Sequence, residues 1–141
     1  MSAVAAKPRN PPEKKERQTV LVVEDEVLVR ISIADFLRDC GYLVIESARA
    51  DEALAVIETG VTVHVVFSDI QMPGELDGIC LARWIRAHRP DLQVILTSGM
   101  ENAAERAGDL CEGGPLLAKP YDPRQVMARI RQLLNAPSGR S

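Results

Sequence analysis

Short runs of apolar residues alternate along the chain with stretches in which apolar residues recur every three or four positions. The runs predict buried strands, and the recurring positions predict amphipathic helices. We expect strands at residues 19–23, 43–46, 63–68, 93–97 and 116–118, and helices at residues 27–40, 51–58, 78–88, 101–112 and 123–134. Strict alternation of this kind indicates an α/β fold with a doubly wound, five-stranded parallel sheet.

The run VLVV at residues 20–23 is apolar at successive positions rather than at every second one. This pattern is typical of strands that helices cover on both faces, an arrangement that right-handed crossovers produce. The helical positions predicted to face the core are Val27, Ile31, Ala34 and Leu37 in the first helix, and Ile79, Ala82 and either Trp84 or Ile85 in the third.

The two ends of the chain differ in composition from the middle. Residues 1–18 are rich in proline, lysine and glutamate, without apolar periodicity, and we expect a disordered tail. Residues 136–141 are expected to form a short C-terminal tail, which leaves residues 19–135 as one domain with a single core. The start shows no signal-peptide pattern, and no apolar run is long enough to span a bilayer.

Composition excludes some classes of function. The net charge is −3 and no basic stripe is present, which gives no support for nucleic-acid binding. Cys40, Cys80 and Cys111 are odd in number and widely spaced, as expected for reduced, mostly buried thiols of a cytoplasmic protein. His64 and His88 lie far apart without metal-ligand spacing, so structural or solvated roles are expected.

Charged residues stand where three of the predicted strands end. Glu24, Asp25 and Glu26 follow the first strand, Asp69 follows the third, and Lys119 follows the fifth. Each feature alone has an ordinary explanation: a helix N-terminus, an Asx turn or a solvated loop. The carboxyl ends of parallel strands meet at one edge, however, and carboxylates gathered there repel one another unless a cation lies between them. Their joint placement predicts a Mg²⁺ site beside a phosphorylatable aspartate.

Five stretches carry a resemblance to a known family: VLVVEDE (20–26), SDIQMPG (68–74), DG (77–78), VILTSG (94–99) and AKPY (118–121). With them the chain resembles the receiver domain of bacterial two-component response regulators, of the chemotaxis-receiver type. The resemblance implies a flavodoxin-like (βα)5 fold with strand order 2-1-3-4-5.

The resemblance also implies roles for individual residues. Asp69 matches the phosphoacceptor, and Lys119 matches the lysine that contacts the phosphoryl group. Glu24 and Asp25 match the acidic pair that binds Mg²⁺ together with Asp69. Gln71 matches the position whose backbone carbonyl is a further metal ligand.

Two positions leave the switching mechanism open. The family places a threonine or serine, followed by a small residue, at the end of the fourth strand, and both Thr97 and Ser98 qualify. We favour Ser98, because the following Gly99 leaves the most open approach to a phosphate. Leu116 stands where the family often has an aromatic residue, so the signal is expected to leave the site by another route.

Little chain remains after Lys119, so we expect no output domain and predict a stand-alone receiver in the cytoplasm. Its implied partners are a histidine kinase or histidine phosphotransfer protein and a downstream protein. The latter would dock on the face formed by the fourth helix, fifth strand and fifth helix. The chain would catalyse only its own phosphorylation and dephosphorylation.

Three alternatives to this function stay open. The first is a degenerate receiver that acts only as a protein-interaction module. The second is a phosphatase of the haloacid dehalogenase type, which is disfavoured because Gln71 stands where that chemistry needs a general acid. The third is that the chain is a fragment of a longer protein.

Overall fold

The computed structural model describes residues 17–72, 76–98 and 117–135. Its strands are β2 (Thr19–Val23), β3 (Leu43–Ser47), β4 (Val65–Asp69), β5 (Gln93–Ser98) and β6 (Leu117–Ala118). Its helices are α1 (Val27–Asp39), α2 (Ala50–Glu58), α3 (Gly78–His88) and α5 (Pro123–Leu134). All strand pairs are parallel, in the order β3-β2-β4-β5-β6. In chain order this is 2-1-3-4-5, which confirms the predicted fold.

β2 has the predicted bounds, β3 and β5 each end one residue later than predicted, at Ser47 and Ser98, and the largest difference is at the start of β4. That strand begins at Val65 rather than Val63, because the ring of His64 interrupts the ladder: its Nδ1 accepts the Thr19 N–H at 2.9 Å. At its other end β4 includes Asp69 itself. The helix expected at residues 101–112 and the predicted first residue of the fifth strand, Leu116, lie outside the described residues.

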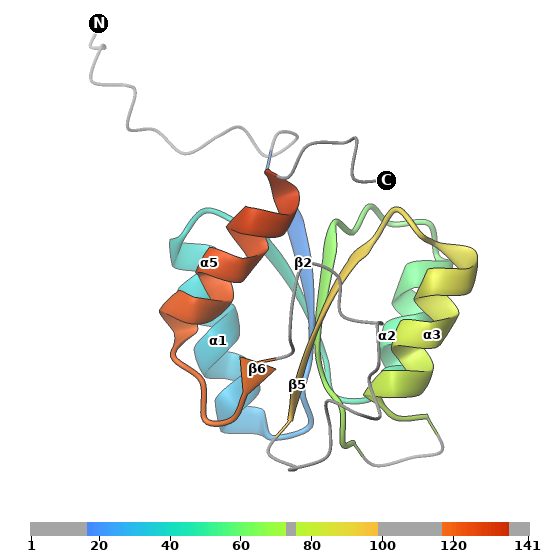
Figure 1. The fold of residues 1–141 in the computed structure, drawn as a ribbon, viewed down its shortest axis with the longest axis horizontal. Helices are drawn as coiled ribbons and strands as arrows, with labels where there is room; N and C mark the ends of the chain where they lie inside the picture. Colours follow the sequence, from blue (N-terminus) through green and yellow to red (C-terminus); the bar gives the residue numbers. More distant parts are fainter. Residues whose placement is uncertain (1–16, 73–75, 99–116, 136–141) are drawn as a thin grey trace, which may run out of the picture.

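Two helical layers cover the sheet, with α1 and α5 on one face and α2 and α3 on the other (Figure 1). Alternate residues of β2 serve the two layers, which explains why all five are buried. The α1–α5 side of the core contains Val20, Val22, Ile33, Leu37, Val65, Phe67, Ile95, Val126, Ile130 and Leu133. The α2–α3 side includes Leu21, Val23, Ala53, Ile57, Val66, Ile79, Ala82, Ile85 and Leu96.

The predicted buried face of α1 is partly wrong. Ala34 is buried with Ile33 and Leu37, but Val27 is 53% and Ile31 43% exposed. The face turned toward the sheet includes position 30, an arginine that is only 18% exposed. At 100° per residue this turns Ile31 well away from the core, while Val27 lies in the first turn, beyond the last residue of β2.

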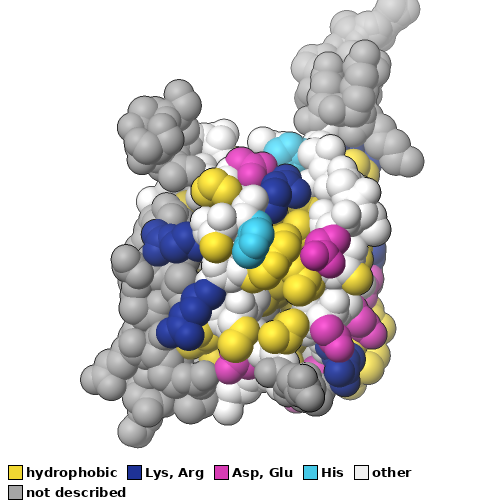
Figure 2. All heavy atoms as spheres, turned by 90° about the vertical axis from the view of Figure 1, so that its right-hand side faces the viewer, with side chains coloured by type: hydrophobic (Ala, Val, Ile, Leu, Met, Phe, Trp, Pro, Cys, Tyr) yellow, Lys and Arg dark blue, Asp and Glu magenta, His cyan; other side chains and the backbone are white. Residues whose placement is uncertain are grey.

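On α3, Ile79, Ala82 and Ile85 are buried, so Ile85 rather than Trp84 is the inward residue. Trp84 is partly buried and stacks on the His88 ring, with ring centroids 4.5 Å apart. His64 and His88 therefore both have structural contacts. Figure 2 shows the outer surface of the molecule on the side of α2 and α3, where acidic, basic and hydrophobic side chains are interspersed.

The expectation of buried thiols is wrong for two of the three cysteines. Cys40 and Cys80 are free and exposed, because one caps the end of α1 and the other lies on the outer side of α3. Cys111 lies outside the described residues. Within the described ranges, no helix has both the length and the apolar character needed to cross a membrane.

Candidate functional site

The predicted meeting of charges at one edge of the sheet is found. Glu24 follows β2, Asp69 ends β4 and Lys119 follows β6. The ammonium Nζ of Lys119 lies 2.9 Å from Oδ2 of Asp69 and 3.1 Å from Oε1 of Glu24. Three strands that are distant in sequence thus place one cation between two buried carboxylates.

The two carboxylates that contact this lysine belong to a cluster of three. Glu24, Asp25 and Asp69 each offer one carboxylate oxygen, and these atoms lie within 4.8 Å of one another. Glu24 and Asp69 are buried, whereas Asp25 is exposed. Oxygen ligands of this kind suit Mg²⁺, which binds through a few carboxylates and keeps several waters. The residues therefore fit a divalent cation.

Electrostatics agree with a site that needs added positive charge. Burial raises the pKa of Glu24, and the nearby charge of Asp69 adds to that rise, against hydrogen bonds from the Glu26 N–H and Lys119. Burial alone would lower the pKa of Lys119, but its hydrogen bonds to Asp69 and Glu24 outweigh this and raise it above its usual value. Lys119 is therefore an ammonium ion at neutral pH.

The loop after β4 is held close to the site by the start of α3. The Gln71 N–H donates to Oδ1 of Asp69 at 3.3 Å, and the Gly78 N–H donates to the Ile70 carbonyl at 2.8 Å. A Cβ on Gly78 would collide with the Asp69 carbonyl, so only glycine fits there. Asp77 caps α3 by accepting from the Cys80 N–H at 2.9 Å. These contacts explain the DG motif; the metal-ligand role of the Gln71 carbonyl stays a prediction.

The two candidate switch hydroxyls occupy successive positions at the end of β5, and both residues are buried. Thr97 is the register partner of Asp69, and its Oγ1 has no hydrogen-bond partner within the described residues. Ser98 is one position farther toward the site's edge, and its carbonyl accepts the Lys119 N–H at 3.1 Å. The preference for Ser98 stays a prediction.

Sequence reasoning missed two residues at this edge. Arg30 donates from Nη1 to the Glu24 carbonyl at 3.0 Å; the available signal was a basic residue within an apolar helix face. Tyr121 packs edge-on against Phe67, with ring centroids 5.4 Å apart. Burial first, and then the charge of Glu24, raise the pKa of Tyr121 to about 12.

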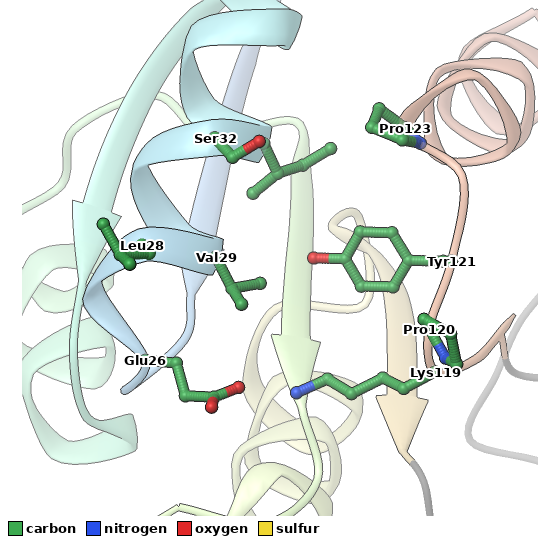
Figure 3. Close-up of a pocket in the computed structure, with 9 residues that line it drawn as sticks. Glu26, Leu28, Val29, Ser32, Lys119, Pro120, Tyr121 and Pro123 are labelled. Carbon is green, nitrogen blue, oxygen red and sulfur yellow. The ribbon is translucent and has the colours of Figure 1, made fainter.

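A hollow of about 610 Å³ lies beside the site, between the start of α1 and the segment after β6 (Figure 3). Glu26 and Lys119 are at one end of it, and Ser32 and Pro123 at the other. Its remaining lining is apolar: Leu28, Val29, Ile33, Pro120 and Tyr121. Leu28 is 82% exposed, which is unusual for so large an apolar side chain. Apolar hollows of this size commonly receive a ligand or a partner's side chain.

Comparison with known proteins decides the family, since residues 20–131 match the model of the response regulator receiver domain. The chain belongs to the receiver domain family. Phosphorylation and Mg²⁺ binding are typical of these domains, which act in two-component signalling and are not classical enzymes. They interact with histidine kinases and downstream targets.

Curated relatives show how this receiver domain is used elsewhere. It is 38% identical over 118 residues to the sensor kinase CckA of Brucella abortus (strain 2308), covering 82% of this chain and 12% of that protein. It is 32% identical over 120 residues to the transcriptional regulatory protein AruR of Pseudomonas aeruginosa, covering 82% of this chain and 48% of the relative. The chain thus spans less than half the length of either relative.

A solved structure supports the fold. The response regulator receiver protein from Sinorhizobium medicae WSM419 superimposes with a TM-score of 0.79 at 28% identity. The match covers 87% of this chain and 98% of that one. The five-stranded parallel sheet and its strand order are therefore those of a known receiver.

Proposed function

We propose that this receiver domain accepts a phosphoryl group on Asp69 from a histidine kinase or a histidine phosphotransfer protein. The observation that carries the proposal is the position of Lys119 Nζ, 2.9 Å from Asp69 and 3.1 Å from Glu24, within a cluster of three carboxylates. Mg²⁺ would be held by Glu24, Asp25, Asp69 and the backbone carbonyl of Gln71.

In the transfer step, an Asp69 carboxylate oxygen attacks the phosphorus atom of the donor's phosphohistidine. An O–P bond forms and the N–P bond breaks, with its electron pair returning to the imidazole nitrogen. When bound, Mg²⁺ would neutralise charge on the phosphoryl oxygens and the carboxylates. The Lys119 ammonium, already in the site, would form charge-assisted hydrogen bonds to the incoming oxygens.

The phosphoryl group would next be bound by a hydroxyl at the end of β5, and we favour Ser98 over Thr97. The bond from the Lys119 N–H to the Ser98 carbonyl supports coupled movement of β5 and β6. We propose that this movement reshapes a downstream docking face made by the fourth predicted helix, β6 and α5. Part of that face lies outside the described residues.

The phosphoryl donor must approach the same edge of the sheet, and we propose that it uses the hollow beside Lys119. Its apolar lining and the exposed Leu28 would pack against the donor protein. We further propose that residues 19–135 form the receiver unit and that the chain acts as a stand-alone regulator in the cytoplasm. The free thiols of Cys40 and Cys80 are in keeping with that compartment.

The test is labelling with a small phosphoryl donor, acetyl phosphate or phosphoramidate, followed by intact mass spectrometry. With Mg²⁺, the wild type should gain one phosphoryl group and Asp69→Asn none. Asp91→Asn is the matched control, because Asp91 is exposed and paired with Arg89 rather than with the site. If neither donor labels the wild type, the result would favour a domain that acts only as an interaction module. Equal labelling of Asp69→Asn would mean that another residue is the acceptor.

A further inference from the structure

Glu24 lies just beyond the end of β2, where only its N–H is still bonded to the neighbouring strand. The register of β2 with β3 ends at Val23 and Ser47, and the last bond runs from the Glu24 N–H to the Ser47 carbonyl at 3.0 Å. The Glu24 carbonyl therefore needs a donor from outside the ladder. Arg30 supplies it from the second turn of α1, at 3.0 Å.

The guanidinium of Arg30 is itself held by the neighbouring strand. Its Nε lies 3.3 Å from Oε1 of Glu46 on β3, and the Arg30 side chain is only 18% exposed. The other oxygen of Glu46 accepts from Arg38 at 3.1 Å, and Arg38 also donates to the Val44 carbonyl. Both arginines thus link α1 to β3 through Glu46. Of the two, Arg30 also donates a hydrogen bond to Glu24 of the acidic site, whereas Arg38 donates to Val44.

The charges at this edge are divided between two kinds of contact. Lys119 binds the carboxylates of Glu24 and Asp69, where it offsets negative charge directly. Arg30 instead binds the Glu24 carbonyl, and its own charge is offset by Glu46. Arg30 can therefore fix the chain between β2 and α1 without occupying the carboxylate oxygens that a metal ion needs.

We propose that Arg30 is a positioning residue for the acidic pair Glu24 and Asp25: it holds the backbone that presents their carboxylates to the divalent cation. The inference rests on the proposed Mg²⁺ site and adds a residue outside the set of metal ligands. Groups that orient metal ligands from behind typically change metal affinity by roughly 10- to 100-fold when removed. Because Arg30 acts through one backbone carbonyl, we expect the lower end, about tenfold.

The experiment is a Mg²⁺ titration by isothermal titration calorimetry, with the Mg²⁺-dependent rise in melting temperature as a second readout. Arg30→Gln should weaken Mg²⁺ binding about tenfold relative to the wild type. Arg38→Gln is the matched control, since it removes an arginine from the same network that does not contact Glu24. Arg38→Gln should leave the Mg²⁺ affinity within about twofold of the wild-type value, even if urea unfolding shows that it loses as much stability as Arg30→Gln.

Arg30→Lys provides an independent variant that keeps the charge. One ammonium cannot reproduce the forked contact with both the Glu24 carbonyl and Glu46, so affinity should fall as in Arg30→Gln. Full rescue by lysine, an unchanged affinity in Arg30→Gln, or an equal loss in Arg38→Gln would each overturn the proposal. A wild type that binds no Mg²⁺ would overturn the proposed metal site itself, which separates the two failures.

Discussion

Gly78 is the position where a single methyl group should affect both stability and phosphorylation. An added Cβ would collide with the Asp69 carbonyl and lie 2.8 Å from the Ile70 Cα. Both are backbone atoms, so neither can rotate away as a flexible side chain would. Overpacking at such a site typically costs about 1–3 kcal/mol, and a gain of up to about 1 kcal/mol in helix propensity offsets part of it.

We therefore expect Gly78→Ala to lower the free energy of unfolding by about 2 kcal/mol, or roughly 8 °C in melting temperature for a domain of this size. Urea unfolding at constant m-value gives the first quantity, and calorimetry gives the second. Because the displaced carbonyl belongs to Asp69, labelling by acetyl phosphate should also become slower.

Gly60→Ala is the matched control. Gly60 has φ 88°, but a Cβ there would meet no atom within 4 Å. Gly60→Ala should lower the free energy of unfolding by about 1–2 kcal/mol, because alanine adopts a left-handed backbone conformation less readily than glycine. It should leave the labelling rate of the folded protein unchanged. If Gly78→Ala is neutral or stabilising, or if both variants slow labelling equally, the steric explanation of the DG motif is wrong.

Four further outcomes are expected. Mg²⁺ should raise the melting temperature of the wild type, and the Glu24→Ala, Asp25→Asn double variant should lose that shift; an unchanged shift would falsify their metal role. Because the folded-state pKa of Glu24 is raised, its contribution to stability is present below its unfolded pKa and is lost as pH rises through its folded pKa. Without Mg²⁺, Glu24→Gln should therefore gain stability relative to the wild type as pH rises from about 4.5 to 7, measured by urea unfolding. Leu28→Asp should slow phosphotransfer from a histidine kinase at least tenfold and leave acetyl phosphate labelling unchanged, because in the proposed docking the exposed side chain would pack against the donor protein and not against the phosphorylation site. With beryllofluoride, hydrogen exchange in residues 98–115 should respond less in Ser98→Ala than in Thr97→Ala, and the reverse order would make Thr97 the switch hydroxyl.

The sheet and its charged edge could be predicted because they depend on local patterns. Apolar runs fix the strands, and parallel pairing then brings Asp69 and Lys119 together whatever the loops do. Periodicity could not predict which apolar residues of α1 are buried. Val27 and Ile31 are as apolar as the buried positions, and their exposure depends on how the helix is rotated against the sheet. Arg30 was missed for the same reason: an arginine in an apolar stripe reads as an interruption until its contact with Glu24 is known.

The choice between Thr97 and Ser98 depends on a different property. In a strand, neighbouring side chains point to opposite faces, so the two hydroxyls belong to different sides of the sheet. The order of Thr97 and Ser98 along the strand is known from the sequence. Which face of the strand end is open to an incoming phosphoryl group depends on the packing around it. The structure pairs Thr97 with Asp69 in the ladder, and the beryllofluoride experiment compares the responses of the two hydroxyls directly.

The placement of Lys119 bears on how phosphorylation can be reversed. The ammonium holds Asp69 and Glu24 together before any phosphate arrives, so its counter-ions are in place in the resting domain. In the proposed cycle the ammonium would exchange a carboxylate oxygen for a phosphoryl oxygen on phosphorylation and would regain the carboxylate oxygen on hydrolysis. The ammonium would neither enter nor leave the site in this cycle, and folding has already removed part of its hydration shell. Because the cation that would meet the added negative charge is already bound, repeated cycles of phosphorylation and hydrolysis would need no movement of Lys119 into or out of the site.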